Sequence, residues 1–470
     1  MPGESSRTPF AVIERSTRIP FAAEAVYAWH SRPGALERLT PPWERIEILE
    51  RTGGVENGSR TVLRVAVPPF AVRWTAIHRD NIPDRQFVDE QSKGPFAHWV
   101  HTHRFAPDGP HASTLTDRIE FALPFGAVGT AAGLPLVRRR IDRFLAYRHS
   151  LLPLDLAAHA RFASAPRIRV AITGSGGLIG RALRAFLSTG GHRVLRLVRG
   201  TAQADEASWD PSRGRLDPGA LAGCDAVVHL AGENVAGGRW TQARRDRIRE
   251  SRRRGTRLIA DTVARLDPPP RVLVSASAIG IYGSRGGEEL RESSATAPTG
   301  MFLADVCREW EAATEPAQKA GIRVALPRFG VVLSPAGGAL KKMLPFFRSG
   351  IGGPVGSGHQ WMSWISLDDV IGAIHHALFT EGLDGPINVV GPQPVTNAEF
   401  AHTLGHILGR PSLIPAPALA LRLLYGEMAD ETVLSSARVL PEKLHATGYE
   451  FRHPTLESAL RFQLGRFAGL

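Results

Sequence analysis

Glycines recur at intervals of three directly after a run of β-branched residues. Gly174, Gly177 and Gly180 follow the alternating segment 168–173, and apolar residues at helical spacing come next. The first glycine permits a tight turn from strand to helix, the second lets the backbone approach a pyrophosphate, and the third lets the helix pack close to the sheet. Free N–H groups at the start of such a helix attract phosphate. The pattern therefore predicts a dinucleotide-binding turn.

A basic side chain ends the next strand-like run, about twenty residues beyond the glycine turn. An acidic residue at this place would bind the 2′-hydroxyl of NAD, whereas Arg199 suits the 2′-phosphate of NADP. A further strand-like run closes on the small residues of segment 229–232, where the backbone must pass close to the adenosine and pyrophosphate. These features predict NADP(H) as the cofactor; the alternative for Arg199 is an exposed arginine without a ligand.

Hydroxyl groups and a histidine are the candidates for chemistry on a substrate. Ser277 ends a strand-like run beside the expected nicotinamide, and Tyr282 follows shortly after it. A tyrosine can donate and accept a proton, and a serine can orient a substrate oxygen. His359 lies in a glycine-rich loop near Trp361 and Trp364, and these three side chains form a candidate substrate wall. The alternatives are packing for Tyr282 and the two tryptophans, and a rigid surface turn for His359.

These residues require an α/β scaffold that brings the ends of several strands together. From residue 166 onward, strand-like runs alternate with helical patterns, and the central runs are continuously apolar, as expected when both faces of a parallel sheet are covered. The strand-like runs are 167–173, 193–198, 225–230, 271–277, 323–333 and 386–390, and the helical patterns are 177–188, 241–265, 302–320, a capped helix from Thr396, 416–426 and 430–440. We expect a Rossmann-like, doubly wound parallel sheet over residues 166–470, with a substrate-covering part from about residue 385.

A different order of elements occupies the first 165 residues. A strand-like run over 10–18 and a helix over 21–39 precede six strand-like runs, and a long helix follows, which we expect Pro153 to kink or end. This order resembles the START-like helix-grip fold of the SRPBCC superfamily, which contains polyketide cyclases and lipid-binding proteins. The resemblance implies an α+β domain over residues 1–165, with an apolar cavity for a hydrophobic ligand. The segment 163–166 is the expected linker to the second domain.

Three histidines within the segment 98–103 raise the question of a metal site. Strand alternation places His101 and His103 on one face and His98 on the other. Two histidines on one face of a strand can bind zinc, but no third ligand is apparent nearby in the sequence. We therefore expect no metal, and a place in the sheet or at the cavity wall for these side chains.

Short motifs throughout residues 168–467 carry a second resemblance. They are Trp209-Asp210-Pro211, Ala231-Gly232-Glu233-Asn234, Ser251-Arg252, Arg328-Phe329-Gly330-Val331-Val332-Leu333, the segment 353–360 and Trp364-Ile365-x-Leu367-Asp368-Asp369. This half resembles an atypical extended short-chain dehydrogenase/reductase of the NAD-dependent epimerase/dehydratase superfamily, in the group often labelled epimerase family protein. Together with the features above, the resemblance implies cofactor contacts at Gly174, Gly177, Leu178, Ile179, Gly180, Val198, Arg199, Leu230, Ala231, Gly232, Arg252, Ser275 and Val332.

The chain departs from this family at the catalytic positions. Extended short-chain dehydrogenases use a Ser or Thr with a Tyr-x-x-x-Lys pair, in which the tyrosine is the acid/base and the lysine lowers its pKa. Phe302 and Val306 stand at the positions of that pair, so of the usual set Ser277 remains. We expect an NADP(H)-dependent oxidoreductase acting on a hydrophobic carbonyl or alcohol, with Tyr282 or water as the proton source. The alternative is a catalytically silent NADP(H)-binding sensor or scaffold; an epimerase also needs proton abstraction and is disfavoured.

Bulk composition narrows the class of partner and the compartment. The chain has 470 residues and a net charge of +12, but its basic residues are spread along the chain and no nucleic-acid motif accompanies them. Two distant cysteines fit a reducing compartment, and the sequence shows neither a signal peptide nor an apolar run of roughly eighteen residues. We expect a cytoplasmic protein that binds small molecules rather than nucleic acid or a membrane; the oligomeric state stays open.

Overall fold

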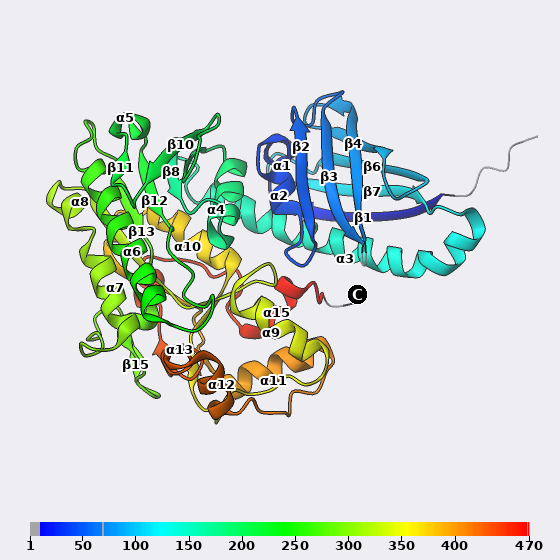
Figure 1. The fold of residues 1–470 in the computed structure, drawn as a ribbon. Helices are drawn as coiled ribbons and strands as arrows, with labels where there is room; N and C mark the ends of the chain where they lie inside the picture. Colours follow the sequence, from blue (N-terminus) through cyan, green and yellow to red (C-terminus); the bar gives the residue numbers. More distant parts are fainter. Residues whose placement is uncertain (1–9, 68–69, 468, 470) are drawn as a thin grey trace, which may run out of the picture. The chain divides into compact units, whose positions relative to one another are not determined.

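The computed structural model describes residues 10–67, 70–467 and 469, and the chain divides into two compact units (Figure 1). The N-terminal unit extends to residue 163 and also includes residues 188–190 and 464–470. The C-terminal unit comprises residues 164–187 and 191–463. Each unit has its own sheet and its own apolar core.

The N-terminal unit is a seven-stranded antiparallel sheet with one long helix, and it confirms the helix-grip fold expected from the order of elements. The strand order is β1-β7-β6-β5-β4-β3-β2. Buried side chains of the long helix, such as Ile141 and Leu145, pack against Ile119 and Phe121 of the sheet. The elements are β1 (Ala11–Ile19), α1 (Ala23–Ser31), α2 (Ala35–Leu39), β2 (Ile46–Thr52), β3 (Arg60–Val67), β4 (Phe70–Ile82), β5 (Gln86–Lys93), β6 (His98–Pro107), β7 (Ser113–Ala122) and α3 (Gly126–Ala160).

The helices of this unit differ from the expectation in two places. The helix expected over 21–39 is two helices, because Gly34 between them adopts a left-handed conformation with φ 92°. The long helix α3 continues through Pro153 to Ala160, so of the two outcomes expected at this proline, an end to the helix is wrong. Leu152 and Leu156, on either side of Pro153, are buried in the core. The free energy gained by their burial offsets the cost of the backbone hydrogen bond that a proline removes from a helix.

The C-terminal unit is built on a parallel sheet whose strand order reverses at β8. The order is β11-β10-β9-β8-β12-β13-β16-β14 with β20 beside β16, and every pair is parallel except β10 with β11. The chain moves from β8 outward through β9 and then returns to the other side of β8 as β12. Sheets of this kind bind ligands at that switch point, outside the carboxyl ends of the strands. The Rossmann-like fold expected from the sequence is confirmed.

Helices cover this sheet and further short elements follow it. Buried residues of α6 and α8 share a core with β8, β12, β13 and β16, and α10 packs against β13 and β16. The strands are β8 (Arg169–Thr173), β9 (Arg193–Val198), β10 (Glu206–Asp210), β11 (Arg215–Leu216), β12 (Ala226–His229), β13 (Val272–Ser275), β14 (Ser277–Ala278), β15 (Glu289–Leu290), β16 (Arg323–Phe329), β17 (Val331–Leu333), β18 (Trp361–Met362), β19 (Trp364–Ser366), β20 (Gly385–Val389), β21 (Val395–Thr396) and β22 (Arg438–Val439). The helices are α4 (Leu178–Thr189), α5 (Pro218–Leu221), α6 (Gln242–Val263), η1 (Ile279–Tyr282), α7 (Phe302–Ala312), α8 (Glu315–Lys319), α9 (Gly338–Arg348), α10 (Leu367–Phe379), α11 (Asn397–Leu408), α12 (Ala418–Tyr425), α13 (Glu427–Glu431), α14 (Glu442–Ala446) and α15 (Leu456–Leu464).

Several boundaries in this unit were not foreseen. The strands β10 and β11 have no counterpart in the expected elements, and the helix expected over 430–440 is wrong, since α13 ends at Glu431 and β22 follows. The strand expected over 323–333 is two strands: β16 ends at Phe329 beside β20, and β17 begins at Val331 beside β19. The capping box at Thr396 and Glu399 is confirmed at the start of α11.

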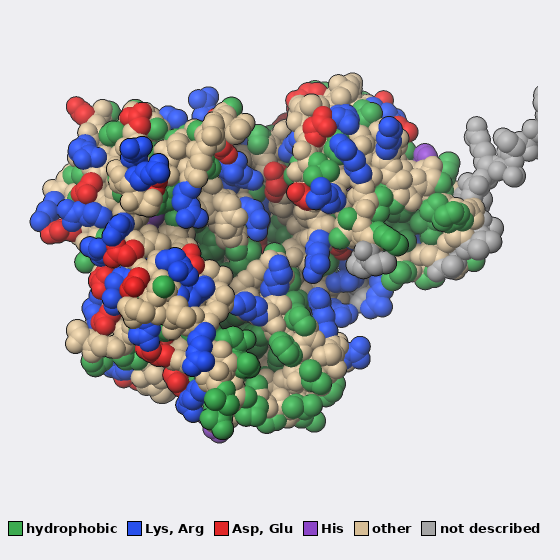
Figure 2. All heavy atoms as spheres, viewed as in Figure 1, with side chains coloured by type: hydrophobic (Ala, Val, Ile, Leu, Met, Phe, Trp, Pro, Cys, Tyr) green, Lys and Arg blue, Asp and Glu red, His purple; other side chains and the backbone are tan. Residues whose placement is uncertain are grey.

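Helix α12 exposes an apolar face. Figure 2 shows hydrophobic side chains gathered over α11 and α12, and those of Leu419, Leu423 and Leu424 are each about two thirds exposed. None of the residues of α12 is buried. Within the described part of the chain, no helix is both long enough and apolar enough to cross a membrane.

Candidate functional site

The glycine turn lies at the switch point of the parallel sheet. Gly174 directly follows β8 with φ +65°, and a Cβ there would lie 2.9 Å from the amide nitrogen of Ala231 after β12. A Cβ on Gly180 would meet the carbonyl oxygen of Gly174, and on Gly177 it would lie 3.2 Å from the same oxygen. The turn is therefore so tight that two of the glycines have no room for any side chain, and the backbone itself forms the surface at the start of α4.

A threonine that the sequence analysis did not single out holds the two strand ends together. The Oγ1 atom of Thr173 accepts hydrogen bonds from the amides of Leu230 (3.1 Å) and Ala231 (3.2 Å), and it lies 2.7 Å from Nδ1 of His229. Burial, helped by the nearby Arg252, lowers the pKa of His229 to about 3, so this ring is neutral. The threonine thus connects the ends of β8 and β12 from within the core.

Two arginines supply positive charge near this turn. Arg199 directly follows β9 and is exposed, and no ion-pair partner for it is found among the described residues. Arg252 of α6 is half-buried; its guanidinium donates to the carbonyls of Glu233 and Ile248 and stacks on Trp310. A Cβ on Gly232 would lie 3.3 Å from this guanidinium. Neither Arg199 nor Arg252 has a carboxylate at ion-pair distance among the described residues, and the partners of Arg252 are neutral carbonyls.

Of the other expected cofactor contacts, two end strands of this parallel sheet and two lie on neighbouring elements. Val198 ends β9, and Ser275 ends β13 with its buried Oγ atom lacking a hydrogen bond among the described residues. Leu178 begins α4 and is approached by Gly337, while Val332 lies in β17. Glycine backbone, a helix start, an orphaned hydroxyl and two cations fit the pyrophosphate, ribose and phosphate groups of a dinucleotide.

A chain of polar side chains extends inward from Ser277. The Ser277 hydroxyl donates to Glu311 at 2.6 Å, and Arg328 donates to both oxygens of the same carboxylate at 2.8 Å. Arg328 also donates to the hydroxyl of Tyr282, which in turn donates to Asn388, each at 2.8 Å. The sequence analysis missed Glu311 altogether and noted Arg328 only as part of a motif. The available signal was Arg328 itself, because a charged residue inside an apolar strand needs a partner.

Tyr282 lies in the core. Its side chain has no exposed surface and packs with Ile281, Leu290 and Cys307, and burial raises the pKa of its hydroxyl above the usual value. Both hydrogen-bonding positions of the hydroxyl are taken by Arg328 and Asn388. This arrangement favours a packing role over proton transfer to a substrate.

The positions of the missing Tyr/Lys pair carry core residues. Phe302 and Val306 lie on α7, are buried, and pack against Trp240, Ile248 and Met428. Two arginines of α6 stack on the Phe302 ring. Neither Phe302 nor Val306 has a side-chain group that can transfer a proton.

The three residues expected at the substrate wall lie in different environments. His359 is exposed, and Trp361 is half-buried beneath the guanidinium of Arg438 at 4.5 Å. Trp364 is fully buried and its indole nitrogen donates to the carbonyl of Gln393 at 2.9 Å. This places Trp364 in the core, whereas His359 and Trp361 retain surface that a ligand can reach.

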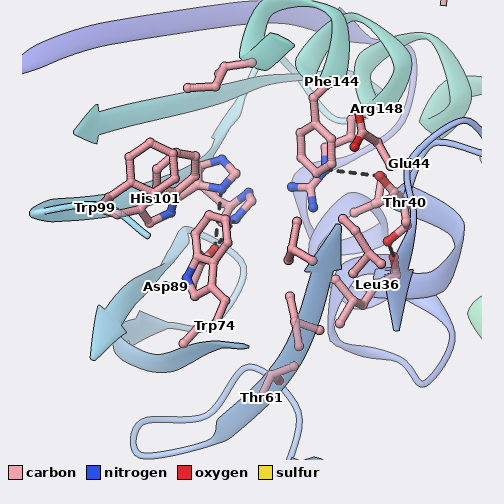
Figure 3. A pocket seen from close by; sticks show the side chains of 18 of the residues that line it. Leu36, Thr40, Glu44, Thr61, Trp74, Asp89, Trp99, His101, Phe144 and Arg148 are labelled. Atoms are coloured by element: carbon pink, nitrogen blue, oxygen red, sulfur yellow. Dashed lines mark hydrogen bonds and ion pairs between the residues drawn. The ribbon is translucent and has the colours of Figure 1, made fainter. Parts of the chain in front are cut away.

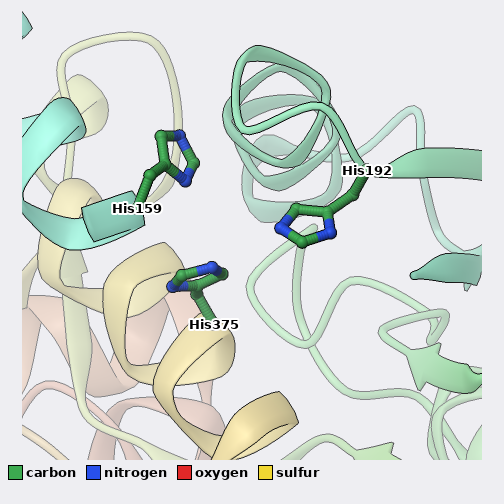
Figure 4. Close-up of side chains that lie close together, drawn as sticks. All are labelled: His159, His192 and His375. Atoms are coloured by element: carbon green, nitrogen blue, oxygen red, sulfur yellow. The ribbon is translucent and has the colours of Figure 1, made fainter. Parts of the chain in front are cut away.

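Two buried histidines of the C-terminal unit act in packing. The side chains of His192 and His375 lie close together (Figure 4). Nδ1 of His192 accepts a hydrogen bond from the amide of Ile168 at 3.2 Å, and His375 of α10 packs edge-on against Phe186 and Phe379. The two rings are 5.9 Å apart. They fix the start of β8 and the contact of α4 with α10.

A cavity of about 340 Å³ lies inside the N-terminal unit (Figure 3). Its volume is within the range of about 300–1,000 Å³ found for small-molecule sites. Most of its wall is apolar and comes from α2, the sheet and α3, as with Leu36, Trp74 and Phe144. Arg148 of α3 stacks on Phe144 and also faces the cavity. The cavity expected from the helix-grip resemblance is therefore present.

One part of the cavity wall is strongly polar. His101 and His103 of β6 and Asp89 of β5 line the cavity, with Asp117 of β7 behind them. Burial opposes charge on both carboxylates, but the neighbouring histidines outweigh it and hold the pKa of each aspartate below its usual range. Burial lowers the pKa of His101, whereas for His103 the two carboxylates outweigh burial and raise it. An apolar cavity with such a cluster on one side suits a ligand that is apolar with one polar end.

Comparison with known proteins identifies the class. Residues 170–391 match the NAD dependent epimerase/dehydratase family, residues 19–146 match the family described as polyketide cyclase/dehydrase and lipid transport, and residues 416–463 match a domain of unknown function, DUF1731. An epimerase family protein of Mycobacterium bovis is 46% identical over 298 residues, which make up 63% of this chain and 98% of that protein. The chain therefore belongs to the NAD dependent epimerase/dehydratase family, and both resemblances noted in the sequence are confirmed.

Two solved structures add to this identification. A structure described as the nucleoside-diphosphate sugar epimerase from Corynebacterium glutamicum is 34% identical, with a TM-score of 0.80 over 97% of this chain and 90% of that chain. The similarity thus extends over both units. The human epimerase family protein SDR39U1, solved with NADPH, is 34% identical over 63% of this chain and 98% of that chain, with a TM-score of 0.58.

Proposed function

We propose that this chain is an NADP(H)-dependent oxidoreductase that acts on a hydrophobic carbonyl or alcohol. The observation that carries the proposal is the glycine turn at the β8–β12 switch point, with the unpaired cation Arg199 at the end of the neighbouring strand. The NADPH in the structure of human SDR39U1 supports the same cofactor here. The apolar cavity of the N-terminal unit supports a hydrophobic ligand.

The chemistry needs a hydride and a proton, and the chain's own residues handle the proton. NADP(H) supplies or accepts the hydride when bound. The Ser277 hydroxyl gives its hydrogen to Glu311, so its oxygen is left free to accept a hydrogen bond from a substrate alcohol. During oxidation the alcohol proton passes to Ser277 as the serine proton passes to Glu311; reduction reverses both transfers. Arg328 holds the carboxylate in place through two hydrogen bonds.

The cofactor assignment predicts a selective effect of Arg199→Ala. Loss of a charge-assisted contact to the 2′-phosphate is worth about 1.5–3 kcal/mol, so NADPH affinity should fall roughly 10- to 100-fold. NADH, which lacks that phosphate, should bind variant and wild type alike. Isothermal titration calorimetry of the full chain with each nucleotide measures this. The matched control is Arg193→Ala, at the exposed amino end of β9. If Arg199→Ala lowers the affinity for NADPH and NADH equally, the assignment of Arg199 to the 2′-phosphate is wrong.

The proton route predicts opposite outcomes for two hydroxyl variants. Ser277→Ala removes the hydroxyl that connects the substrate to Glu311, and turnover should fall by about 10²–10⁴-fold, the range for positioned acid/base groups. Tyr282→Phe leaves this route intact, and turnover should stay near the wild-type value. Single-turnover oxidation of bound NADPH with a panel of apolar aldehydes and ketones measures both. Loss of turnover in Tyr282→Phe alone would return the acid role to that tyrosine.

The buried Phe302 and Val306 favour one alternative function, a silent NADP(H)-binding sensor or scaffold. Tight NADPH binding by the full chain, without hydride transfer to or from any member of the panel, would support this alternative. The same experiment separates the two functions, because both require the nucleotide and only the oxidoreductase consumes it.

A further inference from the structure

The polar part of the cavity wall in the N-terminal unit brings three metal-ligating side chains together. Oδ2 of Asp89 lies 3.5 Å from Nδ1 of His101 and 3.1 Å from Nε2 of His103. One ligand atom from each of the three side chains lies within 4.8 Å of the others. In a tetrahedral zinc site with bonds of about 2.0–2.1 Å, neighbouring ligand atoms are about 3.3 Å apart. The observed spacings bracket that value.

The second nitrogen of each imidazole faces one further carboxylate. Oδ1 of Asp117 lies 3.4 Å from Nε2 of His101 and 2.6 Å from Nδ1 of His103. Its other oxygen lies 3.1 Å from Nε2 of His149, whose Nδ1 is 2.8 Å from the Thr17 hydroxyl. A metal-bound histidine typically gives its other N–H to a carboxylate in this way, which fixes the ring and its tautomer.

The two rings and the two carboxylates form one continuous polar cluster. His103 Nε2 and Asp89 Oδ2 are hydrogen-bonded on the cavity side, and on the other side His101 Nε2 and His103 Nδ1 both lie against Oδ1 of Asp117. A cation on the Asp89 side would direct both remaining N–H groups toward Asp117.

We propose that Asp89, His101 and His103 form a binding site for a divalent first-row metal ion, with Zn²⁺ as the best fit. Two histidines and one carboxylate make three protein ligands, the number found in zinc sites that keep one position open. All three side chains line the cavity, and Asp89 and His101 are labelled in Figure 3. The open position of the metal would therefore face the ligand space. It would take a water molecule or the carbonyl or hydroxyl oxygen of an apolar ligand. The proposal is independent of the NADP(H) function, because all of its residues lie in the N-terminal unit.

Metal uptake by the full chain tests the site directly. Apo-protein prepared with a chelator is loaded with Zn²⁺ or Co²⁺ alone, desalted, and measured by mass spectrometry of its metal content and by the visible spectrum of bound Co²⁺. We expect a Co²⁺ spectrum typical of four- or five-coordinate nitrogen and oxygen ligands, and a melting temperature that rises with Zn²⁺. If the wild-type protein retains no metal, the proposal is wrong, and the cluster is held together by hydrogen bonds between the histidines and the aspartates.

Matched variants locate the ion. Asp89→Asn and His101→Asn should each lose the Co²⁺ spectrum, and Asp117→Asn should weaken Zn²⁺ binding about 10- to 100-fold while keeping the spectrum. His98→Asn is the control, since His98 lies on the same strand but stacks on Phe10. Melting curves without metal show whether each variant is folded. A Co²⁺ spectrum unchanged in folded Asp89→Asn and His101→Asn would place the metal elsewhere and reject this site.

Discussion

Gly180→Ala is expected to abolish NADPH binding and to lower the free energy of unfolding of the C-terminal unit. The new methyl group would meet the carbonyl oxygen of Gly174 and lie 2.8 Å from Cα of Ser175, so backbone rather than a flexible side chain must move. Overpacking of this kind costs about 1–3 kcal/mol. The displaced turn would also lose the surface on which the pyrophosphate rests. Calorimetry with NADPH measures the first effect and urea unfolding the second.

Gly176→Ala is the control within the same turn. A Cβ on Gly176 meets nothing within 4 Å, so this variant adds the same methyl group without a clash. It should keep its stability within about 0.5 kcal/mol, as ordinary surface substitutions do. If Gly180→Ala binds NADPH as well as Gly176→Ala does, the close packing of α4 on the turn is unimportant for the nucleotide, and the assignment of this turn is wrong.

Glu311→Ala is expected to destabilise the C-terminal unit by about 3–5 kcal/mol, the loss typical when one partner of a buried ion pair is removed. The Arg328 side chain is 5% exposed and gives two hydrogen bonds to this carboxylate, so the variant leaves a buried guanidinium without its counter-charge. The remaining partner, the Tyr282 hydroxyl, is neutral. The midpoint of urea unfolding, followed by far-ultraviolet circular dichroism, measures the loss.

Glu315→Ala separates burial from charge in this prediction. Glu315 of α8 pairs with Lys319 at 2.7 Å, but both side chains are more than half exposed, and such pairs contribute at most about 1 kcal/mol. Equal losses in the two variants would mean that the Arg328–Glu311 pair is as well hydrated as a surface pair. A double variant, Glu311→Ala with Arg328→Met, should recover part of the loss because it removes the stranded charge.

The sequence pattern could predict a cofactor-binding turn because the residues of that turn are neighbours in the sequence. Gly174, Gly177 and Gly180 constrain one continuous turn, and the conformation of a turn depends mainly on the residues within it. Arg199 could be proposed for the same reason, since it directly follows a strand that is itself a local apolar run. The family motifs led to the predictions for Ser277 and for the missing Tyr/Lys pair, and the structure shows Phe302 and Val306 buried.

The Ser277–Glu311–Arg328 chain depended on the tertiary structure. Glu311 is near the end of α7 and Arg328 is inside β16, and nothing in the sequence around either residue indicates that one faces the other. Helix packing on the sheet decides this contact. Burial then makes the pair obligatory, because a charge inside the core needs a counter-charge.

Alternation along β6 was enough to place His101 and His103 on one face, but it could not supply their partners. Asp89 lies opposite His101 and Asp117 lies opposite His103 because of the register of β5 and β7 on either side of β6. A shift of one residue in either strand would turn its aspartate to the other face. The sequence by itself predicted the glycine turn, the longer strands of both sheets, and the shared face of His101 and His103. The tertiary structure decided which side chains from different strands meet, because register and helix packing are set by burial over the whole unit.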